Sequence, residues 1–167
     1  MWTELHWVEG PWSGKVALAA RPRGGEWLDE EFANWRRAGV ETIFSLLTPE
    51  EEKDLNLTHE KRAAQDHAMA FRTFPIKDRQ VPESEVRFAK LLEKLDSELA
   101  SGRNVAIHCR QGIGRTGLVA ACLLITKGLE PKAAIRNLTT ARGIPVPETS
   151  EQRRWIEHFA STLAQPK

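Results

Sequence analysis

The stretch VAIHCRQGIGRTG, residues 105–117, decides how this chain is interpreted. Val105-Ala106-Ile107 is a short apolar run typical of a buried strand, and an apolar helical run follows at 118–126. The glycines between the two runs let the backbone curl tightly and turn successive N–H groups inward. Because the following helix adds the partial positive charge of its N-terminus, the loop is predicted to bind an anion.

Two side chains of this loop carry chemistry. Cys109 lies at the floor of the predicted anion site, so we expect the loop to stabilise its thiolate form. Arg115 has a planar fork that can hold two oxygens of a phosphoryl group. The plainer alternatives are a small buried cysteine and a solvated arginine, but a cation is unfavourable at a helix N-terminus unless an anion is nearby. We therefore expect a nucleophile and its clamp on one loop.

Strand-like and helix-like patterns alternate outward from this loop. They predict an α/β fold with a mostly parallel central sheet, helices on both faces and a ligand site beyond the carboxyl ends of the strands. The 105–107 strand, the last parallel one, leads into the anion-binding loop and then a helix. The expected strands are 14–19, 40–47, 71–76 and 105–107, and the expected helices are 28–39, 49–69, 82–101, 118–126, 131–141 and 148–163.

Length and composition limit the other possibilities. The 167 residues suit one domain spanning 1–167, and a net charge of +1 gives no bulk reason to bind nucleic acid or a membrane. The longest apolar run, residues 118–125, is too short to span a bilayer, and the N-terminus does not look like a secretory signal. Two cysteines fit a reducing compartment. We expect a monomeric, cytoplasmic protein without nucleic-acid partner, membrane insertion, metal or cofactor.

His-Cys, five residues and Arg-Thr resemble the signature of the cysteine-dependent protein tyrosine phosphatase superfamily. The small size resembles its dual-specificity branch. FPIKDRQVP at 74–82 looks like the general-acid loop of that branch, and SLLTPEE at 45–51 resembles its preceding segment. The similarity covers about residues 40–160 and is nearest to compact phosphatases of the cyclin-dependent kinase inhibitor 3 type. The order of motifs excludes the low-molecular-weight branch.

The resemblance assigns roles to further residues of the loop. Thr116 would donate to the cysteine sulfur and help it leave, although it could also simply cap the helix. His108 would orient the loop and tune the thiolate, or be an ordinary histidine at a strand end. The phosphate would be bound by the loop residues Arg110, Gln111, Gly112, Ile113, Gly114 and Arg115.

The proton donor is expected on a separate loop. Asp78 lies between a predicted strand and a helix that starts at a proline, whereas Asp66 and Asp96 lie on helices. A simple turn aspartate is the alternative for Asp78. Gln152 resembles the family glutamine that places the hydrolytic water, but Thr149 three residues earlier makes a plain capping box equally possible.

These assignments predict an enzyme that hydrolyses phosphotyrosine, and phosphoserine or phosphothreonine, in proteins or peptides through a phosphocysteine. The chain has little spare length for the segment that deepens the pocket of large tyrosine-specific phosphatases. A phosphoinositide or inositol phosphate phosphatase, a phosphate-binding module without strong catalysis, and a rhodanese-like sulfurtransferase are the alternatives. Cys122 lies in an apolar helix and is expected in the core, with a resolving thiol as the other possibility.

Overall fold

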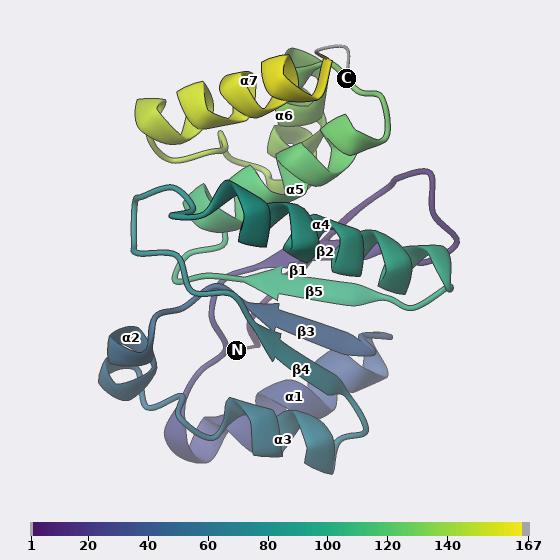
Figure 1. Ribbon diagram of the computed structural model, residues 1–167. Helices are drawn as coiled ribbons and strands as arrows, with labels where there is room; N and C mark the ends of the chain where they lie inside the picture. Colours follow the sequence, from purple (N-terminus) through teal and green to yellow (C-terminus); the bar gives the residue numbers. More distant parts are fainter. Residues whose placement is uncertain (1, 165–167) are drawn as a thin grey trace.

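The computed structural model describes residues 2–164, which form a five-stranded sheet between two layers of helices (Figure 1). The strand order is β1-β2-β5-β3-β4, with β1 antiparallel to β2 and the other neighbours parallel. The predicted mostly parallel α/β fold is therefore confirmed. The strands are β1 Leu5–Val8, β2 Val16–Ala19, β3 Thr42–Ser45, β4 Ala70–Thr73 and β5 Val105–His108.

Helices cover both faces of the sheet, as the sequence predicts. In Figure 1, α1 and α3 lie on one face and α4 on the other, with α5, α6 and α7 beyond it. Each layer has its own apolar core against the sheet. The helices are α1 Leu28–Arg37, α2 Pro49–Asp54, α3 Glu60–Asp66, α4 Glu85–Ala100, α5 Gly114–Thr126, α6 Pro131–Arg142 and α7 Ser150–Ala164, with a short 3₁₀ turn at Gly25–Trp27.

Several predicted boundaries are wrong for local reasons. The 49–69 helix is two helices, because Asn56 adopts a φ of 57° just after α2. α4 begins at Glu85 rather than at Pro82, since the hydroxyl of Ser84 accepts the amide of Arg87 as its N-cap. The last helix begins at Ser150 instead of residue 148. The short strand β1 was missed, because its first three residues are all half-buried and show no alternation.

The centre of the sheet determines where the loop 109–113 lies. β5 pairs with β2 on one side and with β3 on the other, and all four of its residues are buried. α5 begins four residues earlier than predicted, and its residues are buried from Gly114 to Ile125. It packs against α4 and against β2 of the sheet. The loop between β5 and α5 therefore lies at the carboxyl edge of a fixed central strand. Among the described helices none is long and apolar enough to cross a membrane.

Candidate active site

The loop 109–113 is curled as the glycine pattern predicts. The amide of Gly112 donates to Sγ of Cys109 at 3.3 Å, and Gly112 has a φ of 71°. A Cβ on Gly112 would lie 2.5 Å from the backbone carbonyl of Ala19, so both the dihedral angle and the available space require glycine. Cys109 lies at the floor of the loop and is only 3% exposed.

Arg142, the last residue of α6, holds the loop from outside. Its Nε donates to the carbonyl of Gly112 at 3.1 Å and its Nη2 to the carbonyl of Gln111 at 3.0 Å. In a trans peptide the carbonyl and the following N–H point in opposite directions. Drawing the Gln111 oxygen toward Arg142 therefore turns the Gly112 amide toward Cys109. Sequence reasoning missed Arg142, which is an ordinary basic residue in a last helical turn.

Arg115 is a buried cation whose two terminal nitrogens both have hydrogen-bond partners. Its side chain is 1% exposed, and Nη1 and Nη2 donate to the two carboxylate oxygens of Glu51 at 2.6 and 2.9 Å. Nη1 also donates to the carbonyl of Ile76 at 2.7 Å, and Nη2 to Oδ1 of Asp78 at 3.0 Å. The two-point grip on Glu51 compensates for a positive charge at the start of α5.

Glu51 has two functions in the structure. It completes the predicted capping box with Thr48 at the start of α2, and it pairs with Arg115. Burial raises the pKa of Glu51, but hydrogen bonds from Arg115 and Thr48 outweigh burial and bring the pKa to about 2. Burial lowers the pKa of Arg115, while the bond to Glu51 and the nearby charges of Cys109, Glu51 and Asp78 raise it above its ordinary value. The unfavourable position of Arg115 was the sequence signal that a counter-charge exists.

The structure brings Asp78 to the cysteine loop, the segment from Cys109 to Arg115 that leads from β5 into α5. Its side chain is 46% exposed on the segment between β4 and α4, and Oδ1 reaches Arg115. Asp66 ends α3, and Asp96 on α4 binds Lys127 and Trp12, each at 2.7 Å. Of the three aspartates considered, Asp78 therefore has the contact with the cysteine loop that a proton donor needs. Its role in proton transfer stays a prediction.

The acid loop, residues 74–82, is held by the N-terminal end of α7. Arg79, with a φ of 63°, donates to Oε1 of Glu148 at 2.6 Å, and Nε2 of Gln152 donates to the carbonyl of Gln80 at 3.1 Å. A Cβ on Gly114 would lie 2.9 Å from Oε1 of Gln152. The start of α7 thus lies against both loops.

Gln152 is part of a capping box, as one of the two interpretations predicted. Its amide donates to Oγ1 of Thr149 at 3.0 Å, and its Oε1 accepts the amides of Thr149 and Glu148 at 3.1 Å each. The side chain is fully buried. Capping and the contact to the acid loop use both ends of the amide, and placement of a water by Gln152 stays a prediction.

His108 and Thr116 lie buried on either side of the loop. Nε2 of His108 lies 2.7 Å from Oε1 of Glu60 at the start of α3, and its Nδ1 lies 3.4 Å from the carbonyl of Cys109. Glu60 fixes the ring and carries no signal in the sequence. Within residues 2–164, the hydroxyl of Thr116 is buried without a hydrogen-bond partner. It is therefore free to donate to the sulfur, as the resemblance implies.

Cys122 differs from Cys109 in its surroundings. It is fully buried among the apolar side chains of α5, and burial raises the pKa of its thiol well above the ordinary value. This placement fits the core residue rather than the resolving thiol. Across the described residues, no group of three or more His, Cys, Asp or Glu side chains is arranged to hold a metal ion.

Comparison with known proteins decides the family. A sequence profile described as "Polymorphic toxin system, DSP-PTPase phosphatase" matches residues 17–129. The chain therefore belongs to the DSP-PTPase family. The match begins at β2, closer to the N-terminus than the predicted residue 40, and includes Asp78, Cys109 and Arg115 but not Gln152. The predicted membership in the cysteine-dependent phosphatase superfamily is confirmed.

Individual relatives support the same assignment of this DSP-PTPase family member. Human cyclin-dependent kinase inhibitor 3 is 29% identical over 131 residues, which are 77% of this chain and 61% of that protein. PTEN1 of Arabidopsis thaliana, described as a phosphatidylinositol 3,4,5-trisphosphate 3-phosphatase and protein-tyrosine-phosphatase, is 27% identical over 75% of this chain and 31% of its own length. The crystal structure of kinase associated phosphatase, with its catalytic cysteine replaced by serine, has a TM-score of 0.90 at 24% identity and covers 100% of this chain and 99% of that one. The chain spans only 31–61% of the length of the curated relatives it matches.

Proposed function

We propose that this domain hydrolyses phosphotyrosine, and phosphoserine or phosphothreonine, in proteins and peptides through a phosphocysteine on Cys109. The single observation that carries the proposal is the meeting of two loops at Arg115. Arg115 lies in the first turn of α5, the helix that follows Cys109, and its guanidinium also binds Asp78 of the acid loop at 3.0 Å. A nucleophile, an oxyanion clamp and a proton donor thus lie at one edge of the sheet.

The first chemical step forms a bond between Sγ of Cys109 and phosphorus, while the bond from phosphorus to the substrate oxygen breaks. Asp78 gives its proton to that leaving oxygen. The loop amides and Arg115 hold the three equatorial oxygens as negative charge shifts among them. The Gly112 amide, which bonds the sulfur at 3.3 Å, stabilises negative charge on the nucleophile before attack.

The second step releases phosphate. Water attacks phosphorus, Asp78 takes a proton from that water, and the bond between sulfur and phosphorus breaks. The hydroxyl of Thr116 donates to the departing sulfur, and Gln152 is the candidate to place the water. None of these steps needs a metal ion or a cofactor. Activity should therefore persist in EDTA, and a loss that added metal restores would contradict the mechanism.

The charge pattern of the loop supports a protein substrate over a phosphoinositide. Arg110 is the basic residue within the curl, and its Nε already donates to Oε2 of Glu51 at 3.3 Å. Its charge is thus partly compensated, whereas a second phosphate on an inositol ring needs a free cation. A rhodanese-like reaction would not need Asp78 at all.

The test is a panel of phosphotyrosine, phosphoserine and phosphothreonine peptides, phosphoinositides and inositol phosphates, followed by release of inorganic phosphate. We expect the peptides to be the best substrates by kcat/KM. Cys109→Ser should abolish turnover yet retain binding of a phosphate analogue, because an alcohol is a far weaker nucleophile while the amides and Arg115 remain. Preference for a phosphoinositide would overturn the substrate class, and substantial turnover by Cys109→Ser would overturn the mechanism.

A further inference from the structure

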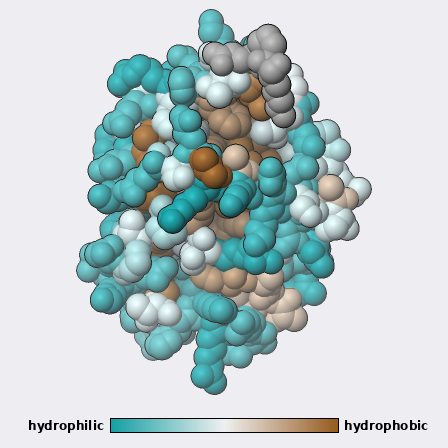
Figure 2. Space-filling view, in the orientation of Figure 1, coloured by the Kyte–Doolittle hydropathy of each residue, from teal (hydrophilic) through white to brown (hydrophobic). Residues whose placement is uncertain are grey.

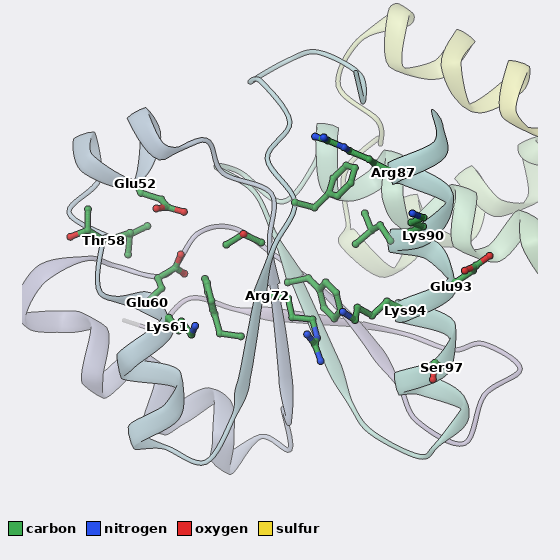
Figure 3. A pocket seen from close by; sticks show the side chains of 16 residues that line it. Glu52, Thr58, Glu60, Lys61, Arg72, Arg87, Lys90, Glu93, Lys94 and Ser97 are labelled. Carbon is green, nitrogen blue, oxygen red and sulfur yellow. The ribbon is translucent and has the colours of Figure 1, made fainter. Parts of the chain in front are cut away.

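A broad groove of about 910 Å³ lies away from Cys109, along the edge strand β4 (Figure 3). One wall is α4, which contributes Arg87, Lys90, Glu93 and Lys94. The other wall comes from α2, α3 and the turn between them, and β4 lies between the two walls (Figure 3). None of the side chains that line this groove has a direct role in the proposed chemistry.

The backbone of β4 is open toward the groove. β4 ends the sheet order, and its other neighbour is β3. The amides of Ala70 and Phe74 donate to Glu41 and Ser45 on the β3 side. Because the direction of backbone groups alternates along a strand, the N–H and C=O of Phe71 and Thr73 point away from β3. An added strand could pair with them.

The α4 wall carries uncompensated positive charge. Arg87, Lys90 and Lys94 are exposed, and none of them pairs with a carboxylate anywhere in residues 2–164. Glu93 is the exposed acid on the same wall. On the opposite wall Glu60 is buried against His108. The groove therefore attracts negative charge on its α4 side.

The spacing of these cations fits an extended chain. Lys90 and Lys94 are one helical turn apart, a rise of about 6 Å. Alternate side chains of a strand on one face repeat every ~6.8 Å. The surface seen in Figure 2 is mostly hydrophilic, so charge and backbone pairing would supply much of the binding. Such strand addition is a common mode of peptide recognition.

We propose that β4 is a docking site for an extended acidic segment of a partner protein, which adds as a sixth strand with alternate carboxylates facing α4. Phe71, half-buried on β4, offers an apolar contact to the side chains that face α3. The proposal is independent of the phosphatase chemistry. The docking site would select the partner protein, and its groove adjoins the start of the acid loop at Phe74.

The test uses a fluorescein-labelled peptide of eight residues that alternates glutamate with valine or threonine and carries no phosphate. Fluorescence anisotropy should show saturable binding that weakens with salt, and NMR should show shifts at the amides of Phe71 and Thr73. Lys90→Glu/Lys94→Glu should weaken binding about tenfold or more, because two attractions become repulsions. Hydrolysis of p-nitrophenyl phosphate should not change.

Matched controls separate this site from general electrostatics. Lys132→Glu/Arg136→Glu reverses two exposed charges at the same spacing on α6 and should leave binding unchanged. A peptide N-methylated at alternate backbone nitrogens should bind weakly, since it cannot pair with β4. Equal loss in both double variants, undiminished binding of the N-methylated peptide, or absence of saturable binding would overturn the proposal. So would shifts centred on residues 109–115, or binding to phosphatidylserine vesicles but not to the peptide.

Discussion

The cysteine loop and the acid loop meet at Arg115 but are built in opposite ways. Cys109 and Arg115 are 3% and 1% exposed, and the curl between them is fixed by glycine geometry and by Arg142. Asp78 is 46% exposed, and its loop is held by Glu148 and Gln152, which lie just before and within the first turn of α7, about 70 residues further along the chain. The proposed phosphate-binding loop is therefore preformed, whereas Asp78, the proposed proton donor, is positioned by contacts that can open.

Replacing Arg115 tests the preformed loop and has the largest expected effect. Arg115→Lys should lower kcat/KM by about 10³-fold, because a point charge cannot reproduce the planar grip on two oxygens. The loss should be similar for activated and unactivated esters. A thermal unfolding curve checks that the fold survives loss of the pair with Glu51. Near-normal kinetics would remove Arg115 from the clamp role.

Replacing Asp78 tests the other loop. Asp78→Asn should lower turnover of a phosphoserine or alkyl phosphate by about 10²–10⁴-fold, but that of p-nitrophenyl phosphate much less, since its phenolate leaves without a proton. The basic limb of the pH–rate profile should also flatten. If Asp78→Asn matches the wild type on both esters while Asp66→Asn or Glu83→Gln shows the contrast, the acid has been misplaced.

The pKa of Glu51 makes the preformed loop sensitive to acid. The folded-state pKa of about 2 lies below the ordinary value of 4.5, so the charged form stabilises the fold above about pH 4.5 and this contribution is lost as the pH falls toward 2. The full contribution is about 3 kcal/mol. Urea unfolding of wild type and Glu51→Gln should show a stability gap that narrows from pH 7 toward pH 3. A gap that does not change with pH would mean that the ion pair with Arg115 contributes no net stability.

Arg142 and Glu148 each hold one of the two loops in place, and replacing them separately tests the comparison further. Arg142→Met removes the donors to the cysteine loop and should lower kcat/KM about tenfold for activated and unactivated esters alike. Inhibition by vanadate should weaken in parallel, a change that a purely structural defect with normal binding would not produce. An effect limited to poor leaving groups would contradict the assignment of Arg142 to the cysteine loop.

Glu148→Gln removes the charged partner of Arg79 and has the smallest expected effect. The side chains are 61% and 27% exposed, so the pair contributes modestly and turnover should fall only a few-fold. The loss should appear with poor leaving groups and be absent with p-nitrophenyl phosphate. Equal losses on both esters would show that Glu148 acts on the cysteine loop instead.

The same contrast explains what the sequence could predict. The glycines that shape the curl from Cys109 to Arg115 lie within seven positions of one another, so the curl and the candidate nucleophile and clamp could be predicted from local pattern. The mostly parallel sheet followed from alternating strand and helix signals. Asp78 could be placed because β4 and α4 flank it closely.

The charged residues that hold the site in place could not be predicted, because each contact depends on the tertiary fold. Glu51 reaches Arg115 across 64 residues, Glu60 reaches His108 across 48, and Glu148 reaches Arg79 across 69. Each is an ordinary charged residue at or near a helix start. β1 was missed because it has no hydrophobic pattern of its own. It is a strand because it pairs with β2.

The position of β5 also constrains the order in which the protein can assemble. β2 and β3 are not neighbours in the sheet; each pairs with β5, which enters the chain about 60 residues after β3 and almost 90 after β2. A chain growing from its N-terminus therefore cannot close its sheet until residues 105–108 have left the ribosome. The strand that completes the sheet is the one that ends at Cys109, so closure of the sheet and placement of the cysteine loop are the same folding event.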